Sequence, residues 1–214
     1  MRDVMRLQPG AQVTLIDADG MSYSGTIVSY DRDGAAVRIG AAEPARKRPA
    51  LIVAAAIIKG PRMDLIVEKT AELGATELWP IICARTVGKA PGAERTTRWR
   101  RLAIAASKQS LVVPPLLVRD AVPFSALLRD VPRGTLALIC SGGAEPMGEV
   151  LARTRPSELL IASGPEGDFE PVEIESATRA GFVSAGLGPN RLRSETAAIA
   201  ALAIAAEWLS RQSS

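Results

Sequence analysis

The chain of 214 residues has no histidine, and aromatic residues make up only 4% of it. Without imidazole the protein cannot build a Ser-His-Asp triad, a histidine-bearing zinc site or a histidine general base. Any acid–base chemistry must therefore use carboxylates, lysines, tyrosines or water. Because its two cysteines, Cys83 and Cys140, do not form a CxxC pair, we expect them to be reduced and buried, and we expect no metal site.

Long apolar runs and targeting signals are also absent from the sequence. Residues 196–206 are rich in alanine but stop at Glu207, which makes them too short to cross a bilayer. The N-terminal segment MRDVMRLQPG has no apolar signal-peptide core. These absences predict a soluble cytoplasmic protein with no membrane partner. Apolar residues form 47% of the chain, which is enough for a sizeable core.

Two common nucleotide-binding fingerprints are missing as well. The sequence contains neither a GxGxxG after its first buried strand nor a GxxxxGK(S/T) segment. The first absence argues against dinucleotide oxidoreductases and ordinary Rossmann methyltransferases, and the second argues against P-loop NTPases.

The first 45 residues have the pattern of a small all-β unit. Short runs of alternating apolar and polar residues are separated by the turn sequences DADG at 17–20 and DRDG at 31–34. Such a unit is too small to hold a large core of its own. The polar segment AAEPARKRP follows at 41–49, and we place a domain boundary there, between residues 47 and 48.

After this boundary, strands alternate with helices. Continuous apolar runs predict buried strands over 51–58, 77–83, 135–141, 158–163 and 182–187. Helical spacing and helix-ending glycines predict helices over 61–73, 94–109, 170–180 and 194–211. This order predicts an α/β domain with a parallel sheet that is covered by helices.

Two glycine-marked loops follow the strands predicted over 158–163 and 182–187. The first is GPEGD at 164–168, and the second is GPNRLR at 188–193, directly before the helix-capping Ser194. Ligands of open α/β sheets bind at the carboxyl ends of strands, and glycines let the backbone approach a ligand closely. The loops can therefore line one pocket, although two tight strand-to-helix turns would give the same pattern.

The basic residues gather in the middle of the chain. Residues 51–110 carry a net charge of +5, and Arg95, Arg98, Arg100 and Arg101 lie in one predicted helix. The residues of that helix that should face the sheet are Trp99, Leu102, Ala103 and Ala106. Arg95 and Arg100 should then point outward, and Arg98 and Arg101 should lie beside the apolar stripe. The cluster is either a phosphate-binding face or a solvated helix surface.

Three segments carry a resemblance to a known family. They are KGPRMDLIVEKTAELGATELWPIICART at 59–86, LIASGPEGDFEPVEI at 160–174 and GLGPNRLRSETAAIAAL at 186–202, and VMRLQPG at 4–10 adds a further match. With these segments the chain resembles the 16S ribosomal RNA uridine N3-methyltransferases (RsmE), which are part of the SPOUT superfamily of knotted methyltransferases. The resemblance covers nearly the whole chain.

The resemblance implies more about the fold than the pattern of elements does. It implies a SPOUT-type parallel sheet over residues 48–214, with a deep C-terminal trefoil knot, which is a rare exception among folds. It also implies a PUA-like β-barrel that binds RNA over residues 1–47. Because the resemblance starts almost at Met1, this domain would be trimmed at its N-terminus, or the start codon is misassigned. The knot would bring the loops at Gly164 and Gly188 together.

The same resemblance implies an activity, which is S-adenosylmethionine-dependent methylation of a uridine N3 in the 16S rRNA of the assembled small ribosomal subunit, by a homodimer. The cofactor residues that it implies are Gly164, Glu166, Gly167, Leu187, Gly188, Leu192 and Ala197. We expect Arg193 to stabilise the developing uracil anion or to hold a phosphate, with Glu166 or Glu195 orienting it. A salt bridge inside the knot is the alternative role of Arg193. Arg95, Arg98, Arg100 and Arg101 would bind rRNA phosphates.

Two further features depart from the family pattern. Asp168 stands where a glycine is usual, and Lys108-Gln109-Ser110-Leu111-Val112 replaces an EQSGR-like segment. The second departure removes a carboxylate and a Gly-Arg pair. The alternatives that remain are an RNA- or ribosome-binding module that has lost catalysis, and a SPOUT methyltransferase with another RNA target.

Overall fold

A computed structural model describes residues 7–17, 21–32, 34–44, 48–87 and 90–212 of the chain. The chain divides into two compact units, residues 1–47 and 48–214. The turns predicted at 17–20 and 31–34, the connection at 41–49 and the VMRLQPG segment lie partly outside the described residues.

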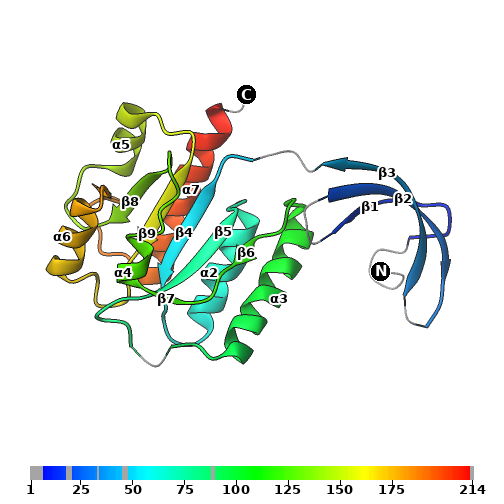
Figure 1. The fold of residues 1–214 in the computed structure, drawn as a ribbon, viewed down its shortest axis with the longest axis horizontal. Helices are drawn as coiled ribbons and strands as arrows, with labels where there is room; N and C mark the ends of the chain where they lie inside the picture. Colours follow the sequence, from blue (N-terminus) through cyan, green and yellow to red (C-terminus); the bar gives the residue numbers. More distant parts are fainter. Residues whose placement is uncertain (1–6, 18–20, 33, 45–47, 88–89, 213–214) are drawn as a thin grey trace. The chain divides into compact units, whose positions relative to one another are not determined.

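The described part of the N-terminal unit is a three-stranded antiparallel sheet (Figure 1). Its strands are β1 (Gln12–Ile16), β2 (Met21–Tyr30) and β3 (Ala35–Pro44). Three strands are present, as the alternating runs predict, and the β2–β3 ladder runs from Tyr30 and Ala35 to Met21 and Pro44. Within the described residues this sheet is open, since β1 and β3 each pair with β2 alone.

The second unit is built on a sheet of seven parallel strands (Figure 1). The strands are β4 (Leu51–Ala56), β5 (Glu77–Ile82), β6 (Leu117–Val118), β7 (Val122–Pro123), β8 (Leu136–Cys140), β9 (Leu159–Ser163) and β10 (Val183–Ala185). Their order is β10-β8-β9-β4-β5-β6, and β7 pairs with the end of β5. The predicted parallel sheet is confirmed, and its strands all end at one edge.

Six helices of the described chain belong to this unit. They are α2 (Pro61–Glu72), α3 (Ala93–Ser110), α4 (Phe124–Leu127), α5 (Met147–Thr154), α6 (Pro171–Arg179) and α7 (Ser194–Gln212). The four predicted helices are present within two residues of their predicted ends. None of the helices in the described part of the chain is both long and apolar enough to cross a membrane.

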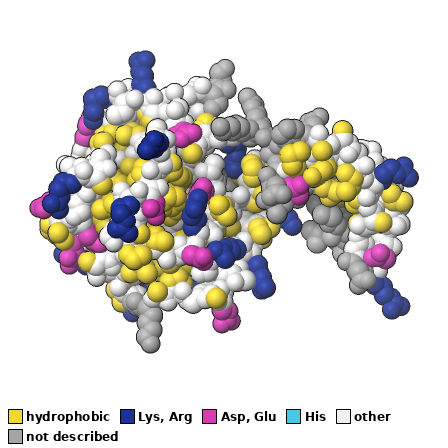
Figure 2. Space-filling model, viewed as in Figure 1, with side chains coloured by type: hydrophobic (Ala, Val, Ile, Leu, Met, Phe, Trp, Pro, Cys, Tyr) yellow, Lys and Arg dark blue, Asp and Glu magenta, His cyan; other side chains and the backbone are white. Residues whose placement is uncertain are grey.

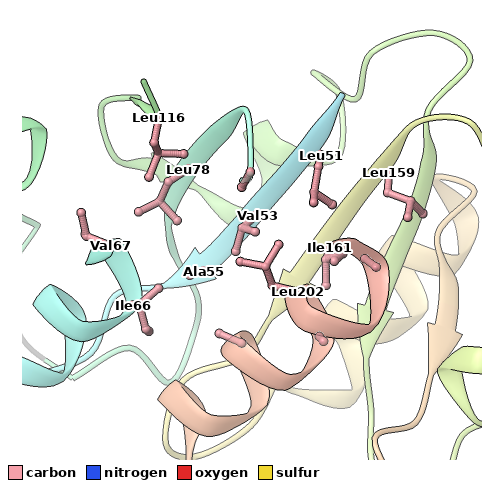
Figure 3. Close-up of a cluster of buried hydrophobic side chains, with 14 of the residues drawn as sticks. Leu51, Val53, Ala55, Ile66, Val67, Leu78, Leu116, Leu159, Ile161 and Leu202 are labelled. Carbon is pink, nitrogen blue, oxygen red and sulfur yellow. The ribbon is translucent and has the colours of Figure 1, made fainter. Parts of the chain in front are cut away.

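The two faces of the sheet bury different side chains because successive residues of a strand point in opposite directions. On β4, Leu51, Val53 and Ala55 join the core beneath α2, α3, α5 and α7, whereas Ile52, Ala54 and Ala56 join the core beneath α4 and α6. Figure 3 shows the first core, in which Val53 and Ile161 point toward Leu202 of α7. Burial on both faces explains why these strands have continuous apolar sequences.

The segment between α3 and β8 was not assigned any element from the sequence. It contains the two-residue strands β6 and β7 and the single turn of α4. Elements this short give no periodic signal, and Pro114, Pro115 and Pro123 interrupt the segment.

Candidate active site

A cavity of about 510 Å³ lies at the carboxyl edge of the parallel sheet. The loops after β8, β9 and β10 and the first turns of α2 and α7 surround it. Six of the seven residues assigned to a cofactor line this cavity, namely Gly164, Glu166, Leu187, Gly188, Leu192 and Ala197. Arg193 lines it as well. The two glycine-marked loops therefore share one pocket and are not merely two separate turns.

The GPEGD loop turns sharply after β9. The Asp168 amide donates to the Pro165 carbonyl at 2.9 Å, and Asp168 has a φ of 63°. Its carboxylate accepts a hydrogen bond from the Phe169 amide at 2.8 Å, and such local bonding makes the left-handed conformation accessible to aspartate. Gly164 has a different role, because a Cβ there would lie 3.2 Å from the buried Phe169 ring.

Gly167 is the one assigned cofactor residue that does not line the cavity. It faces Arg85, which follows β5. The Arg85 guanidinium donates to the Gly167 carbonyl at 2.7 Å, and a Cβ on Gly167 would lie 3.1 Å from Arg85 Cδ. Gly167 is thus needed for close packing of the loop against Arg85, and we had not assigned Arg85 a role from the sequence.

The loop after β10 depends on Gly188. Its φ is 104°, a conformation that residues with a side chain rarely adopt. A Cβ at this position would meet no heavy atom within 4 Å. The requirement for glycine is therefore conformational, and the backbone beside the cavity is left uncovered.

The two carboxylates that we expected to orient Arg193 lie against Arg62 instead. Arg62 is in the first turn of α2, and its Nη2 donates to Glu166 Oε1 at 2.8 Å. Its Nη1 lies 3.8 Å from Glu195 Oε2. Arg193 is exposed, and within the described residues it forms no ion pair with either carboxylate. The two carboxylates meet Arg62 because α2 begins at the carboxyl edge and brings its own arginine there.

Glu195 is an unusual carboxylate in this arrangement. Only 9% of its side chain is exposed, and its Oε2 has no hydrogen-bond partner in the described part of the chain. Glu195 lies in the first turn of α7, where the helix dipole favours a negative charge. The site therefore contains a buried carboxylate oxygen without a hydrogen bond. It lies 3.8 Å from Arg62, which is hydrogen-bonded to Glu166.

A family model described as an RNA methyltransferase domain matches residues 46–206. The chain is also 30% identical over 212 residues to the ribosomal RNA small subunit methyltransferase E of Bacillus subtilis, a match that covers 94% of this chain and 83% of the relative. The chain belongs to the ribosomal RNA small subunit methyltransferase E family.

Two further members of the methyltransferase E family show how far the similarity extends. The Mycobacterium bovis protein is 31% identical over 212 residues, covering 93% of this chain and 79% of its own. The crystal structure of the Neisseria gonorrhoeae protein, bound to S-adenosyl methionine, matches with a TM-score of 0.82 at 30% identity, over 94% of this chain and 85% of that one. The sequence and the fold of this chain therefore match those of these relatives along nearly its whole length.

Asp168 and Leu111, two residues at which we expected departures from the family pattern, share a backbone feature. Their φ values are 63° and 59°. Leu111 ends α3 in the left-handed conformation with 85% of its surface exposed. Both residues therefore adopt a conformation that glycine adopts more readily.

The basic helix α3 packs as expected but presents its arginines differently. Trp99, Ala103 and Ala106 are buried and Leu102 packs against the core, which confirms the apolar stripe. Arg95, which we expected to point outward, is half-buried. Its guanidinium lies 5.1 Å from the Trp99 ring centroid and donates to the Ile58 carbonyl at 3.3 Å. Arg95 points inward because its guanidinium is attracted to the indole face of Trp99 and bonds to the Ile58 carbonyl.

Two more arginines of α3 are held by neighbouring elements. Arg98 pairs with Asp64 of α2 at 2.5 Å. Arg100 donates to the Val118 carbonyl at 3.0 Å and to Asp120 at 2.9 Å. Arg101 is exposed, and within the described residues its guanidinium forms no hydrogen bond or ion pair. Figure 2 shows that Lys and Arg side chains are interspersed with Asp and Glu side chains on one face of the molecule.

The two cysteines are free and buried, as expected. Burial raises the pKa of the Cys140 thiol to about 12, with a smaller effect of Asp168. Burial also raises the pKa of Cys83 to about 12, with a smaller effect of Glu173. Cys140 lines the cavity, but a thiol with such a pKa is protonated at neutral pH and is a poor nucleophile.

Proposed function

We propose that this protein is an S-adenosylmethionine-dependent methyltransferase of small-subunit ribosomal RNA. The observation that carries the proposal is the single cavity that both glycine-marked loops line at the carboxyl edge of the sheet. The related Neisseria protein, whose fold matches along most of the chain, was crystallised with that cofactor.

The residues present fit this cofactor. A cavity of about 510 Å³ is within the usual range for small-molecule sites. Leu187, Leu192 and Ala197 offer an apolar wall for the purine. Charges of both signs line the cavity, from Glu166, Asp168, Arg62, Arg191 and Arg193, which suits a ligand that carries a sulfonium, an ammonium and a carboxylate group.

When bound, S-adenosylmethionine supplies an electrophilic methyl group. The contribution of the chain is mainly to position the two reactants. We propose the N3 atom of a uridine in 16S rRNA, within the assembled small subunit, as the acceptor. This nitrogen must lose a proton, so a nearby cation would lower the barrier by stabilising the uracil anion. Arg193 suits this role because it lines the cavity and is exposed and free of ion pairs within the described residues.

For the RNA we propose contacts from residues 1–47, as an RNA-binding domain, and from the exposed arginines of α3. Arg101 is free within the described residues. Arg98 and Arg100 are exposed themselves, and their ion pairs, with the partly buried Asp64 and the exposed Asp120, lie near the surface, where such pairs are weak. Such pairs can be exchanged for phosphates, because release of condensed counterions favours binding. Arg95 contributes less in this proposal, since its guanidinium is engaged by Trp99 and Ile58.

We also propose the C-terminal knot and the homodimer that the family resemblance implies. In support of the knot, residues 141–147 contact the residue that follows β10. The Gly186 amide donates to the Glu145 backbone carbonyl at 2.7 Å, and the Gly186 carbonyl accepts from the Met147 amide at 2.9 Å. A Cβ at Gly186 would lie 2.4 Å from the Ala144 carbonyl. For the dimer, Leu65 of α2 and Ile204 of α7 leave apolar surface exposed.

Two measurements test the proposed function. Calorimetry should detect binding of S-adenosylmethionine and its displacement by S-adenosylhomocysteine. Mass spectrometry of 16S rRNA from a deletion strain should show the loss of one methyl group from a uridine, restored with the gene. Cofactor binding without any change in the rRNA would favour another RNA target. Ribosome binding without cofactor binding would favour a non-catalytic module, which the altered segment at 108–112 would suit.

A further inference from the structure

Among the residues that the structure describes, Arg62 is the only cation placed between Glu166 and Glu195. It lines the cavity together with Glu166, to which it is hydrogen-bonded at 2.8 Å. Glu195 lies more than a hundred residues further along the chain, and its Oε2 is at ion-pair distance, 3.8 Å, from the same guanidinium but has no hydrogen-bond partner among the described residues. One arginine thus pairs with two carboxylates and forms a hydrogen bond with one of them.

The arrangement leaves the more buried carboxylate without a hydrogen bond. Glu166 is partly exposed, with 30% of its side chain accessible, so water can solvate it without Arg62. Glu195 is 9% exposed, so its Oε2 has little access to water and no hydrogen-bond partner among the described residues. Because a buried oxygen without a hydrogen bond costs more than an exposed one, a hydrogen bond from Arg62 to Glu195 is favoured once Glu166 has another partner.

We propose that Arg62 is a positioning residue with two alternative partners, and that filling the cavity moves its guanidinium from Glu166 to Glu195. Glu166 is then free to accept hydrogen bonds from the bound molecule. The inference rests on the proposed function, because it takes an adenosyl cofactor as that molecule. It involves no covalent step and no proton transfer.

The proposal makes opposite predictions for two substitutions of similar chemistry. In Glu195→Gln the second partner loses its charge, Arg62 stays on Glu166, and S-adenosylhomocysteine should bind about tenfold more weakly. Adding Arg62→Ala releases Glu166, so the double variant should bind more tightly than Glu195→Gln alone. In Glu166→Gln the charged acceptor itself is lost, since the amide keeps only one neutral and weaker acceptor oxygen, and adding Arg62→Ala should restore nothing.

The test is calorimetric titration of the full-length protein with S-adenosylhomocysteine, which carries no transferable methyl group. Glu149→Gln, an exposed glutamate on α5, is the matched control and should bind as the wild type does. A double variant that binds no better than Glu195→Gln would assign Arg62 a purely structural role and overturn the proposal. Absence of binding by the wild-type protein would overturn the proposed function, and this inference with it.

A structure of the wild-type protein with S-adenosylhomocysteine gives a second measurement that does not depend on variants that fold. Arg62 should be within hydrogen-bond distance of Glu195, and Glu166 should contact the ligand. If Arg62 remained bonded to Glu166, as at the present 2.8 Å, while the ligand occupied the cavity, the proposal would be refuted.

Discussion

The loops of the pocket and helix α3 use charged residues in different ways. The loops line the cavity, and their Arg191 and Arg193 stay exposed without ion pairs in the described structure. On α3, three of four arginines are tied to groups of other elements, at Ile58, Asp64, and Val118 with Asp120.

This difference distinguishes arginines that are available to a ligand from arginines that stabilise the fold. A free cation at a cavity can be removed with little effect on the fold, because no internal partner is left unpaired. A cation held by a carbonyl or a buried ring contributes to packing before it can contribute to binding. Charge density in a sequence therefore overstates the number of cations that are available to a ligand.

The largest effect is expected from Arg193→Ala. If this cation stabilises the uracil anion, methyl transfer to 30S subunits should fall by about a hundredfold or more, while binding of S-adenosylhomocysteine stays within about twofold of the wild type. Transfer of a labelled methyl group is the measurement. Arg191→Ala, an exposed arginine on the same loop, is the control and should retain activity. Equal losses in both variants would indicate a general role in RNA attraction.

Gly188→Val tests whether the pocket depends on backbone conformation. Valine at a φ of 104° is strained, so the loop should rearrange and cofactor affinity should fall by roughly tenfold to a hundredfold. The measurement is calorimetric titration with S-adenosylmethionine. Gly148→Val is the control, because Gly148 has no positive φ and no atom near its would-be Cβ. Unchanged affinity in Gly188→Val would place the cofactor elsewhere.

Arg95 and Arg101 form a matched pair on one helix. Arg95→Ala removes the contact with Trp99 and a hydrogen bond, and should lower the free energy of unfolding by about 1 kcal/mol. Arg101→Ala should leave stability unchanged but reduce the salt dependence of RNA binding by about one unit of slope. Urea unfolding and RNA titrations at several salt concentrations measure the two effects. A reversed pattern would show that Arg95 is the RNA contact.

Much of the fold could be predicted from the sequence because it depends on local patterns. Strands such as β4 are apolar on both faces, and helices such as α2 and α6 begin at prolines. The pocket was predictable for the same reason, since its glycines follow strand ends. The short elements β6, β7 and α4 were not, because they are held in place by tertiary contacts.

Partners of charged side chains could not be predicted from the sequence. Arg62 meets Glu166 and Glu195 only because α2, the loop after β9 and α7 converge at one edge of the sheet. Arg85 likewise reaches Gly167 from a different strand end. Within α3, spacing showed which face is buried, but the direction of Arg95 depends on the carbonyl of Ile58. A signal was available in the position of Arg62, in the first turn of the helix that follows a buried strand.

The effect that is smallest at neutral pH concerns the two buried thiols, one at the pocket and one at the end of β5. Their ordinary pKa is 9.0, and in the folded protein it is about 12. Both thiols are protonated in the folded and unfolded chain below pH 9, so their contribution to stability is complete there. Between pH 9 and 12 only the unfolded chain ionises, so the free energy of unfolding falls as pH rises, by up to about 1.4 kcal/mol per pH unit for each thiol.

Comparison with Cys140→Ala isolates this contribution from lysines and tyrosines that titrate in the same range. The variant should be less stable than the wild type at pH 8, because a side-chain atom is removed from a packed site. The difference in the free energy of unfolding between the wild type and the variant should narrow as the pH rises to 10, since only the wild type loses the Cys140 contribution. Urea unfolding at pH 8, 9 and 10 measures it. Cys83→Ala should behave in the same way. If the difference in the free energy of unfolding from the wild type stayed constant with pH for both variants, burial would not keep the thiols protonated.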